Sequence, residues 1–203
     1  MSIKCSRNRS IYAAAAFLAA FGVSGSSVGA QKPEVQRLFQ SGSYEQAVEA
    51  AQNGDPASTY LAAQALMRLE RADRAGEEFN RLNAGPDVWR LIGSSGTALL
   101  ANNAGEAVAL ARKAVEADGG NPFAHYQLGL SASKANDWGT AVPAFTKAVE
   151  LKPDFAYAHY YAALAYQRSR NLAKTAEHFD AFLRLAPDAP ERGAVMAILR
   201  TIK

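Results

Sequence analysis

The C-terminal half of the sequence contains an internal repeat of about 34 residues. When residues 121–154 are aligned with residues 155–188, His125 falls on His159, Phe145 on Phe179 and Pro153 on Pro187. A further step of the same length upstream pairs small residues with small residues: Ser95 with Gly129, Ala107 with Ala141 and Ala114 with Ala148. A unit of this length cannot bury its apolar face alone, so the repeat predicts a solenoid of stacked units.

Each repeat contains two helical stretches separated by a short polar break. Asp137 lies in such a break, and Asp154 lies where a second helix ends. Both are expected to cap the helix that follows, because a carboxylate accepts hydrogen bonds from the free N–H groups of a first turn. We predict helices over residues 33–40, 44–52, 56–69, 72–83, 87–101, 104–117, 122–134, 138–151, 155–169 and 172–185. A last helix from Pro190 to about Ile202 would cap the final unit.

The repeat resembles the tetratricopeptide repeat family in specific motif residues. Residues 121–154 supply Leu128-Gly129, Ala141 followed by Phe145, then Ala148 and Pro153, with His125 where tryptophan is usual. The resemblance is strong over residues 88–188 and degenerate over residues 33–87. It implies an all-α fold, an α-solenoid of about five helix-turn-helix units with a C-terminal capping helix.

The resemblance places these units at residues 33–53, 54–87, 88–120, 121–154 and 155–188, with the capping helix over 190–202. The degenerate first unit is either a short N-terminal cap or a face used for dimerisation. Gly129, Ala163 and Ser95 are small where the two helices of a unit cross, and Phe145 and Phe179 are expected to fill the wedge between units.

Residues 1–30 have the order of a secretory signal peptide, with a predicted cut after Ala30. Lys4, Arg7 and Arg9 precede an apolar stretch over residues 11–23, and small residues follow it. The stretch is too short for a stable membrane span, which needs about 20 apolar residues. An organellar transit peptide is the alternative, but the compact apolar core favours export to the periplasm or secretion.

Charge and cysteine content exclude several functions for the exported chain. The formal charge of +3 equals the three basic residues of the signal, so the remainder is neutral and gives no electrostatic basis for nucleic-acid binding. The only cysteine, Cys5, also lies in the signal. Disulfides, thiol catalysis and cysteine-ligated metals are therefore excluded after cleavage.

No catalytic or cofactor-binding motif is recognisable in the sequence, so we expect neither an enzyme nor a bound cofactor or metal. A serine nucleophile elbow and a glycine-rich phosphate loop are both missing. His125 and His159 occupy equivalent positions in adjacent units, where packing is favoured over a metal pair because no further ligand accompanies them. His178 is expected at a surface or an interface.

The resemblance implies that the first helix of each unit lines a concave groove. Helices 122–134 and 155–169 would present residues there at spacings of three or four, and Trp89 and Ile92 would extend the row. The predicted partner-binding residues are Trp89, Phe123, Tyr126, Leu130, Lys134, Tyr157, Tyr160, Leu164 and Arg168. Packing of several of these aromatics between helices is the alternative.

A groove of this kind predicts binding of another protein, as a peptide or a helix, in the cell envelope. Exposed aromatic side chains supply contact area at low entropic cost. The lysine and asparagine clamp of chaperone-binding family members is not recognisable here. The alternative is a carbohydrate-binding accessory protein in polysaccharide export, because tyrosine and tryptophan faces also stack on sugar rings. The sequence leaves the oligomeric state open.

Overall fold

The computed structural model of the protein describes residues 31–52 and 54–202. Every regular element in this part of the chain is helical, which confirms the all-α prediction. The predicted signal peptide and its cut after Ala30 lie outside the described residues. None of the described helices is long and apolar enough to cross a membrane. The helices are α1 (Gln31–Gln40), α2 (Tyr44–Ala50), α3 (Pro56–Arg68), α4 (Ala72–Arg81), the short 3-10 helix η1 (Leu82–Ala84), α5 (Asp87–Leu100), α6 (Ala104–Ala117), α7 (Pro122–Lys134), α8 (Trp138–Leu151), α9 (Ala156–Arg168), α10 (Leu172–Leu185) and α11 (Arg192–Ile202).

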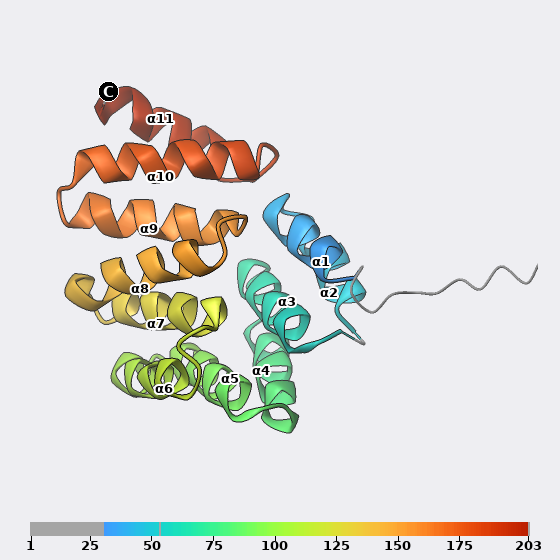
Figure 1. Cartoon of the computed structure of the whole chain (residues 1–203). Coiled ribbons are helices and arrows are strands. Elements are labelled where there is room, and N and C mark those ends of the chain that lie inside the picture. Colours follow the sequence, from blue (N-terminus) through green and yellow to red (C-terminus); the bar gives the residue numbers. More distant parts are fainter. Residues whose placement is uncertain (1–30, 53, 203) are drawn as a thin grey trace, which may run out of the picture.

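Successive helices pack in pairs, and the pairs stack into an α-solenoid (Figure 1). The pairs α3–α4, α5–α6, α7–α8 and α9–α10 each form one helix-turn-helix unit, α1–α2 forms a shorter first unit, and α11 packs on α10. The predicted solenoid with its capping helix is confirmed, and the observed helix ends lie close to the predicted ones.

The turn inside each of the five units has the same geometry. One residue of each turn is in the left-handed region, and the next residue donates its N–H to a carbonyl near the end of the first helix, as in a Schellman motif. The left-handed residues are Gly42, Glu70, Asn102, Asn136 and Arg170. The repeat architecture therefore extends through the N-terminal region, where the sequence motif is degenerate.

Side-chain caps begin most of the second helices and confirm part of the capping prediction. Asn103, Asp137 and Asn171 accept hydrogen bonds from backbone N–H groups at the starts of α6, α8 and α10. The prediction for Asp154 was wrong: α9 begins after Phe155 without a side-chain cap. Asp154 instead accepts a hydrogen bond from Gln36 of α1, because α1 lies against the start of α9.

Small residues let the two helices of a unit approach closely, as predicted for Gly129. A Cβ atom at Gly129 would lie 2.6 Å from the ring of Phe145, which is itself fully buried.

We expect Gly129→Ala to lower the free energy of unfolding by about 2 kcal/mol, because the ring of Phe145 must move within a packed core. The matched control is Gly105→Ala in α6, where a Cβ meets nothing within 4 Å. That change should be neutral or stabilising by up to about 1 kcal/mol, since alanine favours the helix. Urea unfolding of both variants measures the difference, and equal stability would contradict the close packing.

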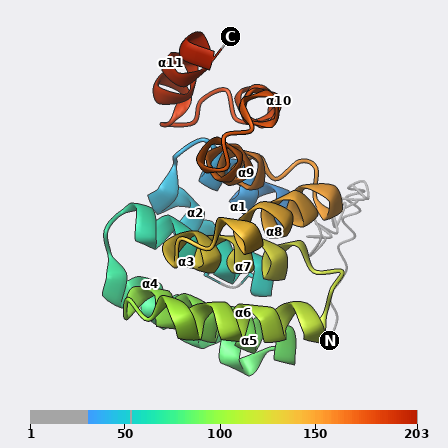
Figure 2. The ribbon, with the colours of Figure 1, turned by 90° about the vertical axis from the view of Figure 1, so that its left-hand side faces the viewer.

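The first two units fold back across the inner face of the later ones. Figure 2 shows α1 and α2 behind α9, and the Gln40 side chain accepts a hydrogen bond of 2.6 Å from the backbone N–H of Ala156 at the start of α9. The ring of Phe39 in α1 lies 4.8 Å from that of Tyr157. Much of the predicted concave face is therefore an interior contact between the N-terminal and C-terminal units.

Candidate functional site

Most aromatic residues of the predicted groove are buried. Phe123, Tyr126 and Tyr157 are 6%, 1% and 0% exposed, respectively. Four others, Trp89, Leu130, Tyr160 and Leu164, are half-buried, while Lys134 and Arg168 are exposed. The expectation of an open aromatic groove does not match this structure. The alternative, that several of these rings pack between helices, describes Phe123, Tyr126 and Tyr157.

Helix α3 covers the part of the inner face that α5 and α7 provide. The ring of Tyr60 lies 5.6 Å from Phe123 and 6.4 Å from both Tyr126 and Trp89. Its hydroxyl donates a hydrogen bond of 2.8 Å to Oε1 of Gln127, which is fully buried. Tyr60 therefore occupies the place that a bound ligand was predicted to take.

A cluster of polar side chains joins the covering helices to the far end of the solenoid. We call it the clasp: Arg68 of α3, Tyr44 of α2, Tyr157 and Tyr161 of α9, and Glu191 before α11. Arg68 forms an ion pair with Glu191, and its Nη2 donates a hydrogen bond of 3.0 Å to the Tyr161 hydroxyl. The guanidinium also lies 4.7 Å from the centre of the Tyr157 ring.

The remaining bonds of the clasp run through Tyr157. Its hydroxyl donates to Oε2 of Glu191 at 2.8 Å and lies 3.0 Å from the Tyr44 hydroxyl. The clasp was not predicted from the sequence, because Arg68 belongs to a degenerate unit. The sequence does contain one sign of it. Arg68 is the last residue of α3, and a basic residue also ends α7 (Lys134) and α9 (Arg168).

The buried phenols stay neutral at ordinary pH. Burial raises the pKa of Tyr60, Tyr126 and Tyr157 above the usual value of 10.0. The hydroxyl groups of these residues therefore act as neutral hydrogen-bonding groups.

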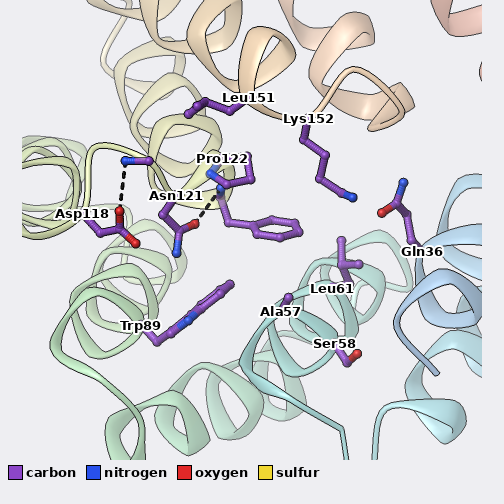
Figure 3. A pocket seen from close by; sticks show the side chains of 12 residues that line it. Gln36, Ala57, Ser58, Leu61, Trp89, Asp118, Asn121, Pro122, Leu151 and Lys152 are labelled. Atoms are coloured by element: carbon purple, nitrogen blue, oxygen red, sulfur yellow. Dashed lines mark hydrogen bonds between the residues drawn. The ribbon is translucent and has the colours of Figure 1, made fainter. Parts of the chain in front are cut away.

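One part of the predicted aromatic face remains open, and we call it the Trp89 hollow (Figure 3). It has a volume of about 460 Å³ and lies where the N-terminal ends of α3, α5 and α7 meet. Among its lining residues are Trp89, Phe123, Asp118, Asn121, Gln36 and Lys152.

Polar groups at the Trp89 hollow are positioned by the start of α7. Oδ1 of Asn121 accepts hydrogen bonds from the N–H groups of Phe123 and Ala124 at 2.9 and 3.3 Å. Figure 3 shows the Asn121 amide nitrogen on the side of Trp89. Asp118 accepts a bond of 2.9 Å from the N–H of Gly120. The hollow therefore offers an aromatic surface with an amide donor and a carboxylate acceptor beside it.

A second hollow of about 280 Å³ lies beside the clasp and contains two other predicted residues, Leu130 and Lys134. Arg68 and Tyr161 also line it. Arg168 does not join Lys134 there, because its guanidinium lies 5.8 Å from the centre of the Trp138 ring. The predicted residues are thus not gathered in one site: Trp89 and Phe123 line the first hollow, and Leu130 and Lys134 line the second. Tyr160, Leu164 and Arg168 line neither hollow.

The histidines occupy packed positions. His125 is 9% exposed, and its Nε2 lies 2.9 Å from the carbonyl of Gly119. His159 makes the equivalent contact with the carbonyl of Pro153 at 3.1 Å. His178 was expected at a surface or an interface, but it is 6% exposed and pairs with His159 inside one unit. Within the described residues, no group of three or more metal-ligating side chains comes together.

We expect His178 to make the protein less stable in acid. Burial, together with the nearby His159, lowers the pKa of His178 from 6.5 to about 4. Because the unfolded chain takes up this proton near pH 6.5, the stability contributed by neutral His178 is complete above that pH and is lost as the pH falls towards 4. Between about pH 7 and pH 4.5 in EDTA, the unfolding free energy should fall by about 2 kcal/mol more than in His178→Gln. Urea unfolding measures the stability of both proteins at each pH. If the stability of the wild type and of His178→Gln fell equally with pH, His178 would not be the source of the acid sensitivity.

Comparison with known proteins defines the class of this fold. Residues 126–190 match the profile of the tetratricopeptide repeat family. No curated protein sequence matches the chain. The first tetratricopeptide repeat domain of Spaghetti (RPAP3), solved with the HSP90 peptide SRMEEVD, has a TM-score of 0.53 and 19% identity, covering 57% of this chain and 90% of that chain. The described chain is thus a tetratricopeptide-type helical solenoid.

Two further solved structures are less similar in shape. MamA from Desulfovibrio magneticus RS-1, from residue 41 to its end, has a TM-score of 0.48 and 23% identity over 79% of this chain and 96% of that chain. YrrB, described as a tetratricopeptide repeat protein with an unusual peptide-binding site, has a TM-score of 0.49 and 22% identity over 77% of this chain and 80% of that chain.

Proposed function

We propose that this protein is an exported, non-catalytic interaction scaffold of the bacterial cell envelope that binds an extended segment of another protein. Export is inferred from the order of charged, apolar and small residues over 1–30. Interaction is inferred from the tetratricopeptide-type fold, and the Spaghetti domain of similar fold is bound to a peptide in its solved structure. Sequencing the N-terminus of the protein isolated from the periplasm tests both export and the cut after Ala30.

The binding site we assign is the Trp89 hollow, and one observation carries this assignment. The Trp89 hollow is where the predicted aromatic face remains accessible, with the half-buried Trp89 beside Phe123. Its volume of about 460 Å³ falls within the range of specific binding pockets. An apolar side chain of the partner would rest against the indole of Trp89. The partner's backbone carbonyl and N–H would meet the Asn121 amide and the Asp118 carboxylate.

A pull-down with matched tryptophan variants tests the assignment. Chains carrying Trp89→Ala or Trp138→Ala are crosslinked in envelope extract, and partners common to the wild type are quantified by mass spectrometry. Loss of an aromatic anchor costs about 2 kcal/mol, so Trp89→Ala should weaken capture about thirtyfold. Trp138→Ala should capture normally, because Trp138 does not line the hollow. Equal capture by Trp89→Ala and the wild type would refute the site, provided that circular dichroism shows both to be folded.

Carbohydrate binding is the second candidate, and the same hollow contains an observation that favours it. A half-buried indole with a carboxylate and an amide at its edge can stack on a sugar ring and bind its hydroxyl groups. The chain has two tryptophans, so Trp138→Phe leaves Trp89 as the sole indole fluorophore. In that variant, a bound glycan should change the fluorescence of Trp89. An unchanged spectrum with envelope polysaccharide, together with specific protein capture, would decide for the protein partner.

A further inference from the structure

Two imidazoles face each other in the last repeat. His159 of α9 and His178 of α10 place their Nδ1 atoms 3.2 Å apart, with ring centroids separated by 5.3 Å and planes inclined by 48°. One face of His178 stacks on Tyr166 at 5.4 Å. The pair is partly buried.

The preceding repeat shows that the fold does not require this pair. His125 occupies the position of His159, and each contacts the carbonyl of the residue six positions upstream, Gly119 and Pro153, respectively. The position of His178, however, is taken by Ala144 in the earlier repeat. A single histidine therefore satisfies the structural role, and the second imidazole is an addition in the last repeat.

The hydrogen bond from His159 to Pro153 orients the Nδ1 lone pair of His159 towards His178. Because a carbonyl oxygen only accepts, the contact with Pro153 requires the proton of neutral His159 to reside on Nε2. Nδ1 of His159 is then unprotonated and accepts a hydrogen bond from Nδ1–H of His178. A carbonyl that binds the second ring nitrogen is the usual partner that orients a metal-ligating histidine.

The separation of the two nitrogens also matches a metal site. Zinc binds imidazole nitrogen at about 2.0–2.1 Å, so two nitrogens 3.2 Å apart subtend an angle of about 100° at the ion, close to tetrahedral. The charges acting on the pair have both signs: Glu177 is negative, while Lys174 and Arg184 are positive. Lys174 forms an ion pair with Glu177, and together with Arg184 these three groups carry a net charge of +1 beside the pair.

We propose that His159 and His178 form a two-imidazole site for a divalent zinc or copper ion. Both Nδ1 atoms bind the ion, which replaces the hydrogen bond between them, and the proton of His178 moves from Nδ1 to Nε2. Both imidazoles therefore bind as neutral groups without a net change in their protonation. Water fills the remaining positions, because the described residues bring no third protein ligand to the pair. The affinity is therefore lower than that of a four-ligand structural zinc site. This site is separate from the Trp89 hollow and does not depend on its function.

Zinc titration of the untagged full chain tests the proposal. Cys5→Ser is included in every variant so that the thiol cannot bind the ion. Calorimetry should give one zinc per chain, and zinc should raise the thermal midpoint. His159→Gln and His178→Gln should weaken binding by at least about tenfold, as loss of metal-supporting groups does. The matched control is His125→Gln. His125 has no imidazole partner, so this variant should bind zinc like the parent chain.

Three results would overturn the site: no zinc binding by the parent chain, undiminished binding by His178→Gln, or an equal loss in His125→Gln. If the substituted chains do not fold, nitrogen NMR of the parent chain decides the matter without substitution. Zinc should then shift the Nδ1 resonances of His159 and His178. Shifts confined to Nε2 atoms, or to other residues, would exclude the proposed coordination.

Discussion

Replacing Tyr126 with alanine is expected to lower the free energy of unfolding by about 4 kcal/mol. Tyr126 is 1% exposed, and its ring lies 4.8 Å from Phe155, 5.8 Å from Tyr161 and 5.9 Å from Phe145. Removal of a fully buried aromatic ring leaves a cavity that the surrounding helices only partly fill. Chemical denaturation monitored by circular dichroism measures the loss.

Two variants separate this packing role from a role in binding. Tyr126→Phe keeps the ring and should cost less than about 1.5 kcal/mol, because the shape of the core is conserved. Tyr160→Ala removes a half-buried ring and should cost less than Tyr126→Ala. If Tyr126→Ala were as stable as the wild type but lost partner binding, the inner face would have to be open in solution, contrary to the structure.

Replacing Arg68 with methionine is expected to lower the free energy of unfolding by about 3 kcal/mol. The side chains of Arg68 and Glu191 are 24% and 14% exposed, so the substitution leaves the carboxylate largely buried without its cation. Loss of one partner of a buried ion pair costs about 3–5 kcal/mol, and partial exposure places this pair at the lower end. Hydrogen exchange should also become faster in α2 and at the start of α9, because the clasp joins Tyr44 of α2 to Tyr157 of α9.

A double-mutant cycle assigns this loss to the clasp. The doubly substituted chain, Arg68→Met with Glu191→Gln, should be more stable than the sum of the two single losses predicts, with a coupling of about 1 kcal/mol or more. The matched control is Arg90→Met, which breaks the exposed pair of Arg90 and Asp87. An exposed pair contributes about 1 kcal/mol at most, so a similar loss in Arg68→Met would argue against the clasp.

The covering of the inner face changes where binding is expected. A partner that approaches the interior meets Tyr60, Phe39 and the clasp, which are side chains of the same chain. The Trp89 hollow lies at the edge of this covered region and is accessible without separation of the helices. Trp89 is therefore the better probe of binding, and Tyr126 is the better probe of stability.

Local structure followed closely from the sequence. The repeat period, the polar breaks and the small residues predicted the helices and their pairing, because each depends on contacts within a unit or between neighbours. The predicted cap at Asp137 is formed. Asp154 was assigned wrongly because its partner, Gln36, is 118 positions away in the sequence. A capping pattern includes only nearby backbone groups.

The burial of the predicted groove could not be read from the repeat. Tyr157 has the same place in its helix whether it faces solvent or Phe39, since the periodicity identifies a face but not what covers it. Arg68 and Glu191 are 123 positions apart and belong to no shared motif. Their contact depends on the curvature of the whole solenoid, which sums small rotations between successive units.

The sequence by itself thus determined the helices, the turns between them and the stacking order, because these follow from local contacts that recur in each repeat. Tertiary structure decided which aromatic side chains are accessible. The first two units fold across the inner face, bury Phe123, Tyr126 and Tyr157, and leave Trp89 at an open edge. The physical reason is that accessibility depends on contacts between distant units, whereas a repeat specifies only the contacts between neighbours.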